Sequence, residues 1–199
     1  MEQTKWRAIA EITGSSLSDA QLHLLLGFRD WLVTEALPAG GIGPNEVPRL
    51  DRRHITDSLL FARCLPIDQP EVSDLGSGVG LPGIPLAILR SKTHFRLIDR
   101  SQRRVDLMKR AVRVLDLANV DVVHKEIGLL ENEIGFITSR ATITPDQAFP
   151  LFSGLLAAGG TAALGGSWSR APTHKNWETL DVAAEILDLP VWILIMHRQ

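Results

Sequence analysis

The feature that most constrains the fold is a glycine-dense turn placed between two apolar segments. The turn spans Asp74–Gly83 and contains glycines at positions 76, 78, 80 and 83. Residues 71–74 predict the end of a strand before it, and residues 84–89 predict an apolar helix after it. A strand, a glycine turn and a helix in this order are typical of a site for a nucleotide-like ligand.

Three glycines of the turn have an expected purpose. Gly76 and Gly78 permit positive φ and leave no side chain in the way of a ligand, and Gly80 lets the helix pack closely on the strand. We expect the helix N-terminus to direct bare N–H groups at the bound molecule. A glycine-rich surface turn without a ligand is the alternative, because the spacing alone is a weak signal.

The composition is that of one soluble domain. A chain of 199 residues with 45% hydrophobic content can bury one substantial core. Its single cysteine, Cys64, argues against a disulfide framework and a cysteine-rich zinc site, and no apolar run reaches the roughly 20 residues that span a bilayer. We expect a monomeric, cytoplasmic protein without membrane association, in which residues 1–66 form a helical extension packed on a core of residues 67–199.

Positive charge is concentrated in one segment of an otherwise acidic chain. Residues Arg90–Arg113 include nine basic and two acidic residues, although the net charge of the chain is −2. Arg103, Arg110 and Arg113 are spaced to lie on one face of a helix. Such a segment predicts a surface that meets nucleic-acid phosphates, and a solvated helix face paired with nearby carboxylates is the alternative.

Strands and helices alternate along the chain, and this alternation predicts the fold class. It indicates parallel pairing with right-handed crossovers, hence an α/β fold with a doubly wound, mostly parallel sheet preceded by N-terminal helices. A loop is expected at 38–48 and a turn at 158–160, while 181–189 fit a helix or a strand. Strands are expected at 71–74, 94–99, 120–124, 134–139, 161–164 and 191–196, and helices at 17–37 (with Ser18 as N-cap), 51–62, 84–89, 101–117 and 145–156.

An acidic residue completes the predicted ligand site. Asp99 ends the second predicted strand, 23 positions after Gly76. An acidic side chain in this place accepts hydrogen bonds from ribose hydroxyls, both in dinucleotide enzymes and in methyltransferases that use S-adenosylmethionine. The alternative is a carboxylate that caps the helix beginning near Ser101.

Four segments carry a more specific signature. They are Arg53-His54-Ile55-Thr56-Asp57-Ser58-Leu59, the run from Asp74 through Gly80-Leu81-Pro82-Gly83-Ile84-Pro85-Leu86 to Ile88, Leu97-Ile98-Asp99 followed by Arg103-Arg104, and Thr138-Ser139-Arg140-Ala141. Together they resemble the 16S ribosomal RNA guanine-N7 methyltransferase family, also called glucose-inhibited division protein B. The resemblance extends over Arg53–Gly166.

The resemblance implies a class I methyltransferase fold, S-adenosylmethionine as methyl donor, and N7 of a guanine in small-subunit ribosomal RNA as acceptor. The ribosomal RNA or the small subunit would then be the partner of the basic segment. For the cofactor, Gly76 and Leu81 would line its site and Gly78 would admit its backbone.

The remaining site residues also follow from the resemblance. Asp99 would meet the ribose, and the backbone of Ile127 and Gly128 would border the adenine. Arg140 would lie near the cofactor and the acceptor, and we expect it to contact a phosphate or the cofactor carboxylate. The chemistry of arginine, rather than the resemblance, leads us to expect that Arg53 holds the guanine edge or a phosphate.

The chemistry of the implied acceptor needs no general base. Guanine N7 has an in-plane lone pair and no hydrogen, so alignment and exclusion of water would be the main work of the site. His54 and Asp57, three apart on a helix, are expected to share a hydrogen bond in the cofactor-side wall. Trp31 and Trp192 are expected in the core, and Trp168 is the candidate for stacking on an RNA base.

Some features of the family are missing, and rival hypotheses stay open. Val47-Pro48-Arg49-Leu50 stands where the family has Asn-Leu-Thr, and Gly165 replaces a family lysine after the fifth strand. The alternatives are a divergent, non-catalytic module that binds S-adenosylmethionine or RNA, a methyltransferase for another substrate, and a nicotinamide-dependent oxidoreductase. The last fits poorly, because the chain has no tyrosine.

Overall fold

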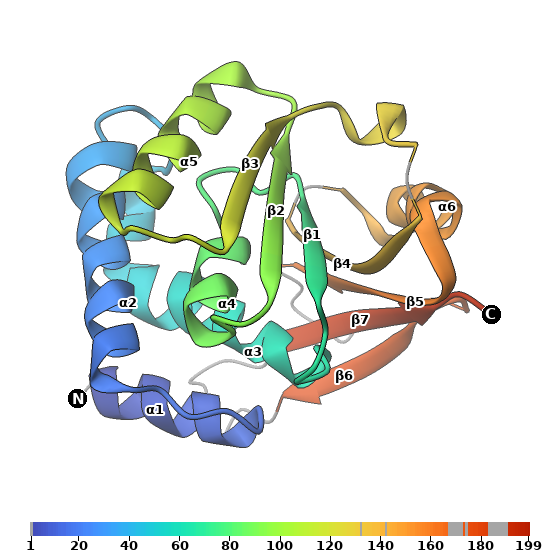
Figure 1. The fold of residues 1–199 in the computed structure, drawn as a ribbon, viewed down its shortest axis with the longest axis horizontal. Coiled ribbons are helices and arrows are strands. Elements are labelled where there is room, and N and C mark those ends of the chain that lie inside the picture. The colour runs from blue at the N-terminus through green and yellow to red at the C-terminus, as the bar shows by residue number, and fades with distance from the viewer. Residues whose placement is uncertain (1, 132, 142, 167–172, 174, 183–190) are drawn as a thin grey trace.

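A seven-stranded sheet forms the centre of the molecule. The computed structural model describes residues 2–131, 133–141, 143–166, 173, 175–182 and 191–199. Within them the strand order is β3-β2-β1-β4-β5-β7-β6. The sheet is twisted, so that β1, β2 and β3 run in a clearly different direction from β4, β5, β6 and β7 in the view of Figure 1. The strands are β1 (Glu71–Leu75), β2 (His94–Asp99), β3 (Val120–His124), β4 (Ile134–Arg140), β5 (Leu156–Gly165), β6 (Glu178–Val182) and β7 (Val191–His197).

The pairing confirms the doubly wound topology. Strands β1 to β5 pair in parallel, whereas β7 is antiparallel to both β5 and β6. The chain leaves β1 toward β2 and β3 and later returns to the other side of β1 through β4. The strand order therefore reverses between β1 and β4, which is where open α/β sheets bind ligands, outside the carboxyl ends of the strands.

Helices cover both faces of the sheet (Figure 1). One buried core contains residues of α1 to α5, and the other contains Ala148, Phe152 and Leu155 of α6. The first core also joins residues on both sides of the predicted division at residue 66. The α-helices are α1 (Glu2–Ile12), α2 (Asp19–Trp31), α3 (Thr56–Leu60), α4 (Gly83–Leu89), α5 (Gln102–Val114) and α6 (Pro145–Leu155).

The N-terminal region is more irregular than its pattern predicts. Ser18 caps α2 as expected, in a capping box with Gln21. The predicted helix over 17–37 ends as α-helix at Trp31 and continues as a π-helix over Leu32–Ala36. The predicted helix over 51–62 consists of a π-helix (Leu50–Ile55), α3 and a 3₁₀-helix (Phe61–Arg63), and a 3₁₀-helix (Pro44–Arg49) occupies part of the predicted loop.

The turn predicted at 158–160 is wrong. These residues lie inside β5, at an irregularity in its register with β4, and Gly159 has φ +74°. A bulge uses a glycine with positive φ as a turn does, so composition does not separate the two. Residues 178–182 form β6, whereas 183–190 and Trp168 lie outside the described residues.

The predicted core tryptophans are confirmed. Trp31 and Trp192 are buried.

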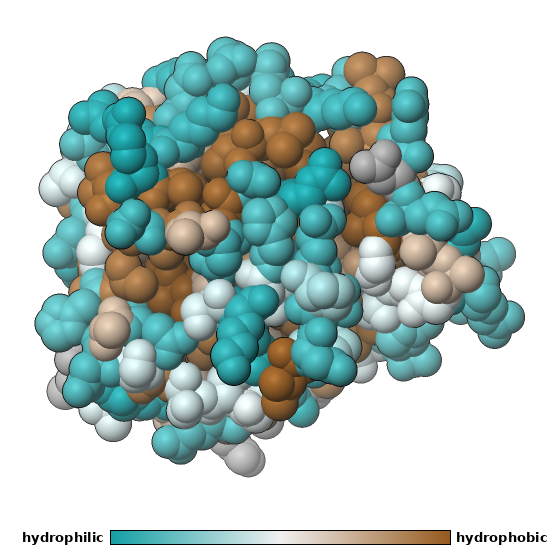
Figure 2. Space-filling view, in the orientation of Figure 1, coloured by the Kyte–Doolittle hydropathy of each residue, from teal (hydrophilic) through white to brown (hydrophobic). Residues whose placement is uncertain are grey.

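On the face drawn in Figure 2, hydrophilic residues surround apolar ones that gather over the area where Figure 1 draws α2, α4 and the neighbouring strands. Among the described residues, no helix combines the length and hydropathy that crossing a membrane requires.

Candidate functional site

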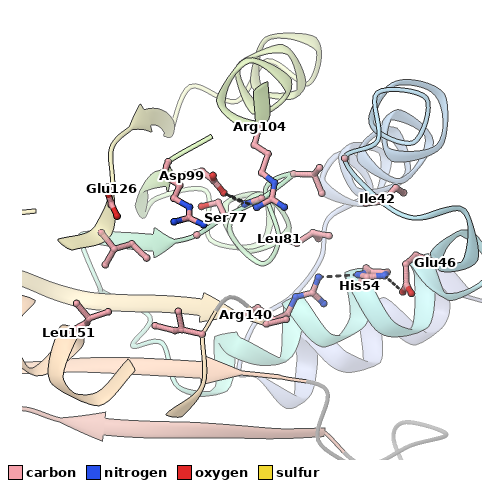
Figure 3. Close-up of a pocket in the computed structure, with 18 of the residues that line it drawn as sticks. Ile42, Glu46, His54, Ser77, Leu81, Asp99, Arg104, Glu126, Arg140 and Leu151 are labelled. Atoms are coloured by element: carbon pink, nitrogen blue, oxygen red, sulfur yellow. Dashed lines mark hydrogen bonds and ion pairs between the residues drawn. The ribbon is translucent and has the colours of Figure 1, made fainter. Parts of the chain in front are cut away.

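A cavity of about 720 Å³ lies outside the carboxyl ends of β1, β2 and β4, at the reversal of strand order. Cavities of this size accommodate small organic ligands and cofactors. Figure 3 shows that its walls come from the sheet edge, α5 and the N-terminal helices. It is lined by Gly41, Ile42, Glu46, His54, Gly76, Ser77, Gly78, Val79, Leu81, Asp99, Arg100, Arg104, Glu126, Ile127, Gly128, Arg140, Ala141, Ile143 and Leu151.

The glycine turn forms the floor of the cavity. Gly78 has φ +63°, and a Cβ added there would meet no atom within 4 Å, so its side-chain position is open space at the cavity. Gly80 has φ +95°, and a Cβ there would stand 2.4 Å from Cδ1 of Ile84 in α4. One glycine thus leaves room for a ligand, and the other permits the close contact with the helix that the sequence predicts.

The expectation of bare N–H groups at the helix N-terminus is wrong. The Gly83 N–H donates to Oδ2 of Asp74 at 3.1 Å, and the Ile84 N–H donates to the Gly80 carbonyl at 2.8 Å. The N–H groups of Gly76 and Ser77 both donate to the carbonyl of Ile98. The turn therefore satisfies these donors internally, and a pyrophosphate would not find them available.

Asp99 lies at the cavity and also stabilises the backbone around it. Its side chain is 3% exposed. Oδ2 accepts the Gly78 N–H at 3.0 Å, and Oδ1 accepts the N–H of Ser101, the N-cap of α5, at 2.9 Å. Nη1 of Arg104 is 3.7 Å from Oδ2. Asp99 thus ties the glycine turn to the start of α5, so the two interpretations of this residue from the sequence do not exclude each other.

The other cofactor-site predictions fall on the same cavity. Leu81 lines it, as do Ile127 and Gly128 from the 3₁₀-helix Ile127–Leu129 after β3. A Cβ at Gly128 would meet no atom within 4 Å. The structure therefore brings together positions separated by about 50 residues in the chain, while their assignment to particular parts of a cofactor stays a prediction.

Arg140, the last residue of β4, extends into the cavity toward the N-terminal helices (Figure 3). Its Nη1 donates to the Arg53 carbonyl at 3.0 Å, and its Nη2 contacts Nδ1 of His54 at 3.0 Å. Arg53 itself is not among the lining residues: its Nε is 3.5 Å from Oδ2 of Asp57. The structure therefore gives Arg53 a backbone contact to Arg140 and places its side chain against Asp57.

The predicted hydrogen bond between His54 and Asp57 is wrong. His54 bonds through Nε2 to Oε2 of Glu46 at 2.8 Å and through Nδ1 to Arg140. His54 lies in a π-helix, whose wider turn alters the side-chain spacing of an α-helix. Its partner Glu46 lies eight residues earlier in the chain, and only Arg140 comes from a distant segment. Glu46 was missed because it falls in the predicted loop at 38–48, whose sequence gives no sign that this residue faces the cavity.

Burial shifts several titrations around the cavity. Burial raises the pKa of Asp57 to about 6, against the opposing charges of Arg53 and Arg140. The pKa of Asp74 is likewise raised to about 6 by burial, partly offset by its hydrogen bonds. Burial and the positive charge of Arg140 lower the pKa of His54, so its ring is neutral at pH 7.

The predicted basic segment does not form one patch. Arg90 is buried and donates to the carbonyls of Thr13 and Ala62, and Arg96 is 3.8 Å from a Glu71 carboxylate oxygen. A second cavity, of about 560 Å³, lies on the outer face of α5. Its lining includes the three arginines expected to share one helix face, in the set Ala39, Arg103, Asp106, Leu107, Lys109, Arg110 and Arg113.

Comparison with known proteins gives relatives that are named as ribosomal RNA methyltransferases. A family model described as rRNA small subunit methyltransferase G (GidB) matches residues 21–187. A "Ribosomal RNA small subunit methyltransferase G" from Leifsonia xyli is 38% identical over 160 residues, which cover 79% of this chain and 73% of that protein. One from Mycobacterium sp. strain KMS is 32% identical over 183 residues, covering 87% and 79%.

Solved structures share the fold at low sequence identity. A SAM-dependent methyltransferase from Aquifex aeolicus has a TM-score of 0.55 at 14% identity and covers 78% of this chain and 99% of that one. A putative S-adenosyl-L-methionine-dependent methyltransferase from Methanococcus maripaludis has a TM-score of 0.56 at 16% identity, with 88% and 92% covered. The predicted methyltransferase-type fold is thereby confirmed.

Proposed function

Because this chain belongs to the rRNA small subunit methyltransferase G family, we propose that it transfers a methyl group from S-adenosylmethionine to ribosomal RNA. The observation that carries the proposal is the cavity at the strand-order reversal, where the glycine turn and Asp99 meet. The acceptor that fits the family resemblance is N7 of a guanine in 16S ribosomal RNA.

The residues at the cavity suit this donor. The open space over Gly78 and Gly128 leaves room for a flat nucleoside, and the Asp99 carboxylate at the cavity offers acceptors for ribose hydroxyls. The engaged N–H groups of the turn disfavour a pyrophosphate and hence a dinucleotide. This contrast supports S-adenosylmethionine, which has no phosphate, over a nicotinamide cofactor.

The chemistry assigned to the site is alignment rather than proton transfer. S-adenosylmethionine supplies a methyl group activated by a positively charged sulfur. Because guanine N7 carries a lone pair and no hydrogen, a general base is not required, and the protein gains rate by orientation and exclusion of water. Arg140 contributes a fixed positive charge, suited to the carboxylate of the donor or to a phosphate of the acceptor.

The second cavity supports an RNA partner. Arg103, Lys109, Arg110 and Arg113 bring four positive charges to one groove beside α5, against one negative charge from Asp106. Arg110 also pairs with Glu35, with Nη2 2.9 Å from Oε2. Arg103 donates to the carbonyl of Ala39, next to the loop residues Gly41 and Ile42 that line the first cavity. We assign this groove to RNA phosphates that flank the methylated base, with binding that weakens as salt rises.

A matched pair of variants tests cofactor binding. Gly78→Ala and Gly159→Ala both place a methyl group at a positive φ with no neighbour within 4 Å, but only Gly78 lines the cavity. Both should lower stability by about 1 kcal/mol from backbone strain. Calorimetric titration should show weaker S-adenosylmethionine binding for Gly78→Ala alone.

Turnover needs a separate assay. Small ribosomal subunits from a strain lacking the modification are incubated with the protein and methyl-labelled S-adenosylmethionine, and the labelled nucleotide is mapped. Label at a guanine N7 supports the proposal. Label elsewhere would indicate another substrate, binding without label would favour the non-catalytic alternative, and binding of NAD instead would refute the assignment of the cofactor.

A further inference from the structure

The cavity contains a short chain of polar side chains, and the family resemblance gives a role to only one of them, Arg140. Glu46 comes from the 3₁₀-helix Pro44–Arg49, His54 from the π-helix Leu50–Ile55, and Arg140 from the end of β4. Figure 3 shows the three side chains in a row along one side of the cavity. The contacts are 2.8 Å from Glu46 Oε2 to His54 Nε2 and 3.0 Å from His54 Nδ1 to Arg140 Nη2.

The chemistry of these groups fixes the position of the histidine proton. A guanidinium has donors only, so Nδ1 of His54 must be the acceptor in its bond to Arg140. A neutral ring with an unprotonated Nδ1 carries its hydrogen on Nε2, which then donates to the Glu46 carboxylate. Both contacts are satisfied only by the neutral Nε2–H tautomer.

We propose that His54 is a positioning residue, which holds the Arg140 guanidinium at the cavity while Glu46 fixes the tautomer of its ring. An arginine side chain loses considerable conformational entropy when it is held in one orientation. Acceptors that already hold the guanidinium before the ligand arrives therefore reduce the entropic cost of binding. Here the Arg53 carbonyl holds Nη1 and the His54 ring holds Nη2. This inference rests on the proposed function only for the identity of the ligand that Arg140 meets.

The arrangement makes binding sensitive to acid in a defined way. Protonation of Nδ1 would turn an acceptor into a donor that faces the Arg140 guanidinium. The charged groups that face the ring are Glu46, Arg140 and Arg53, and Asp57 acts on the two arginines. Since the pKa of His54 lies below its ordinary value, the loss of ligand binding is expected at acid pH.

Two substitutions separate positioning from packing. His54→Phe removes the acceptor and keeps a ring, so the dissociation constant for S-adenosylmethionine should rise about tenfold at pH 7.5. His54→Asn offers an amide oxygen close to the place of Nδ1 but does not titrate. It should bind within about threefold of the wild type at pH 7.5 and should show a smaller fall in affinity between pH 7.5 and pH 5.

The pH comparison has an internal control. Asp57, with its pKa of about 6, titrates in the wild type and in His54→Asn alike, so its contribution cancels between them. Wild-type affinity for His54→Phe, or an unchanged acid decline in His54→Asn, would overturn the proposal. Thermal unfolding of each variant verifies that it is folded before binding is measured.

A second measurement needs no ligand. Nitrogen-15 NMR of the histidine rings in the unliganded wild-type protein should give His54 the shifts of the Nε2–H tautomer at pH 7.5, with the signal identified by its loss in His54→Asn or by its nuclear Overhauser contacts. An Nδ1–H tautomer or a charged ring would refute the proposed contact of His54 with Arg140. If the wild type bound no S-adenosylmethionine, the proposed function would fail, and this spectrum would still decide whether His54 holds Arg140 as proposed.

Discussion

The replacement of Gly165 by alanine should destabilise the protein by a steric effect that the sequence does not reveal. Gly165 ends β5, and a Cβ at this position would stand 2.4 Å from Cζ and 2.9 Å from Cε2 of Phe61. Phe61 is buried at 1% exposure, so its ring has little room to move. Carbon atoms in contact are normally about 3.5–4.0 Å apart, and either the ring or β5 must shift by more than an ångström.

Overpacking of this kind costs about 1–3 kcal/mol, whereas replacing a strand glycine by alanine otherwise gains roughly 0.5–1 kcal/mol. We expect the loss to dominate, with a net fall in the free energy of unfolding of about 1–2 kcal/mol. Urea unfolding followed by circular dichroism would then show a midpoint lower by roughly 0.5–1 M, given a dependence on urea near 2 kcal/mol per M.

The matched control is Gly154→Ala in α6, where an added Cβ meets nothing within 4 Å. This variant should be stabilised by about 0.5–1 kcal/mol, because alanine restricts the unfolded chain. Combining Gly165→Ala with Phe61→Ala should cost less than the sum of the single changes. Wild-type stability for Gly165→Ala, or strict additivity with Phe61→Ala, would refute the steric explanation. Gly165→Lys would introduce the lysine of the family, but its side chain has the same Cβ, so this variant should lose a similar amount of stability.

Three further predictions follow from contacts at the two cavities. Asp99→Asn turns one acceptor into a donor that opposes the Gly78 N–H or the Ser101 N–H. Calorimetry should therefore show at least about tenfold weaker S-adenosylmethionine binding. An unchanged affinity would contradict the role of this carboxylate. Asp57 has a raised pKa of about 6, so the folded state holds its proton more tightly than the unfolded state does. The stability that this proton contributes is present near pH 4 and is lost as the pH rises through 6. Asp57→Asn should make the free energy of unfolding, measured by urea titration between pH 4 and pH 7, fall less with pH, and an unaltered fall would be evidence against this role of Asp57. Arg113→Ala should weaken RNA binding uniformly across sequences and lower the salt dependence by about one counterion, and an unchanged salt slope in a filter-binding assay would exclude Arg113 from the phosphate contacts.

Most of the fold was predictable because it depends on local pattern. The alternation of apolar strands with amphipathic helices predicted the parallel sheet, and Ser18, as an N-cap residue, predicted the start of α2. One failure of the fold prediction occurred where one local signal serves two structures. Ala158-Gly159-Gly160 predicted a turn, yet these residues lie at a bulge inside β5, where Gly159 has a positive φ.

The sequence by itself determined the half of the site that follows β1 and β2. The glycine spacing and Asp99 are encoded within a stretch of about 25 residues, because a strand, a turn and a helix impose their geometry over a short range. Only the tertiary structure decided the other half. Arg53 and His54 contact Arg140 because the N-terminal helical segments pack at the carboxyl end of β4, and contacts across more than 80 residues leave no periodic trace in the chain.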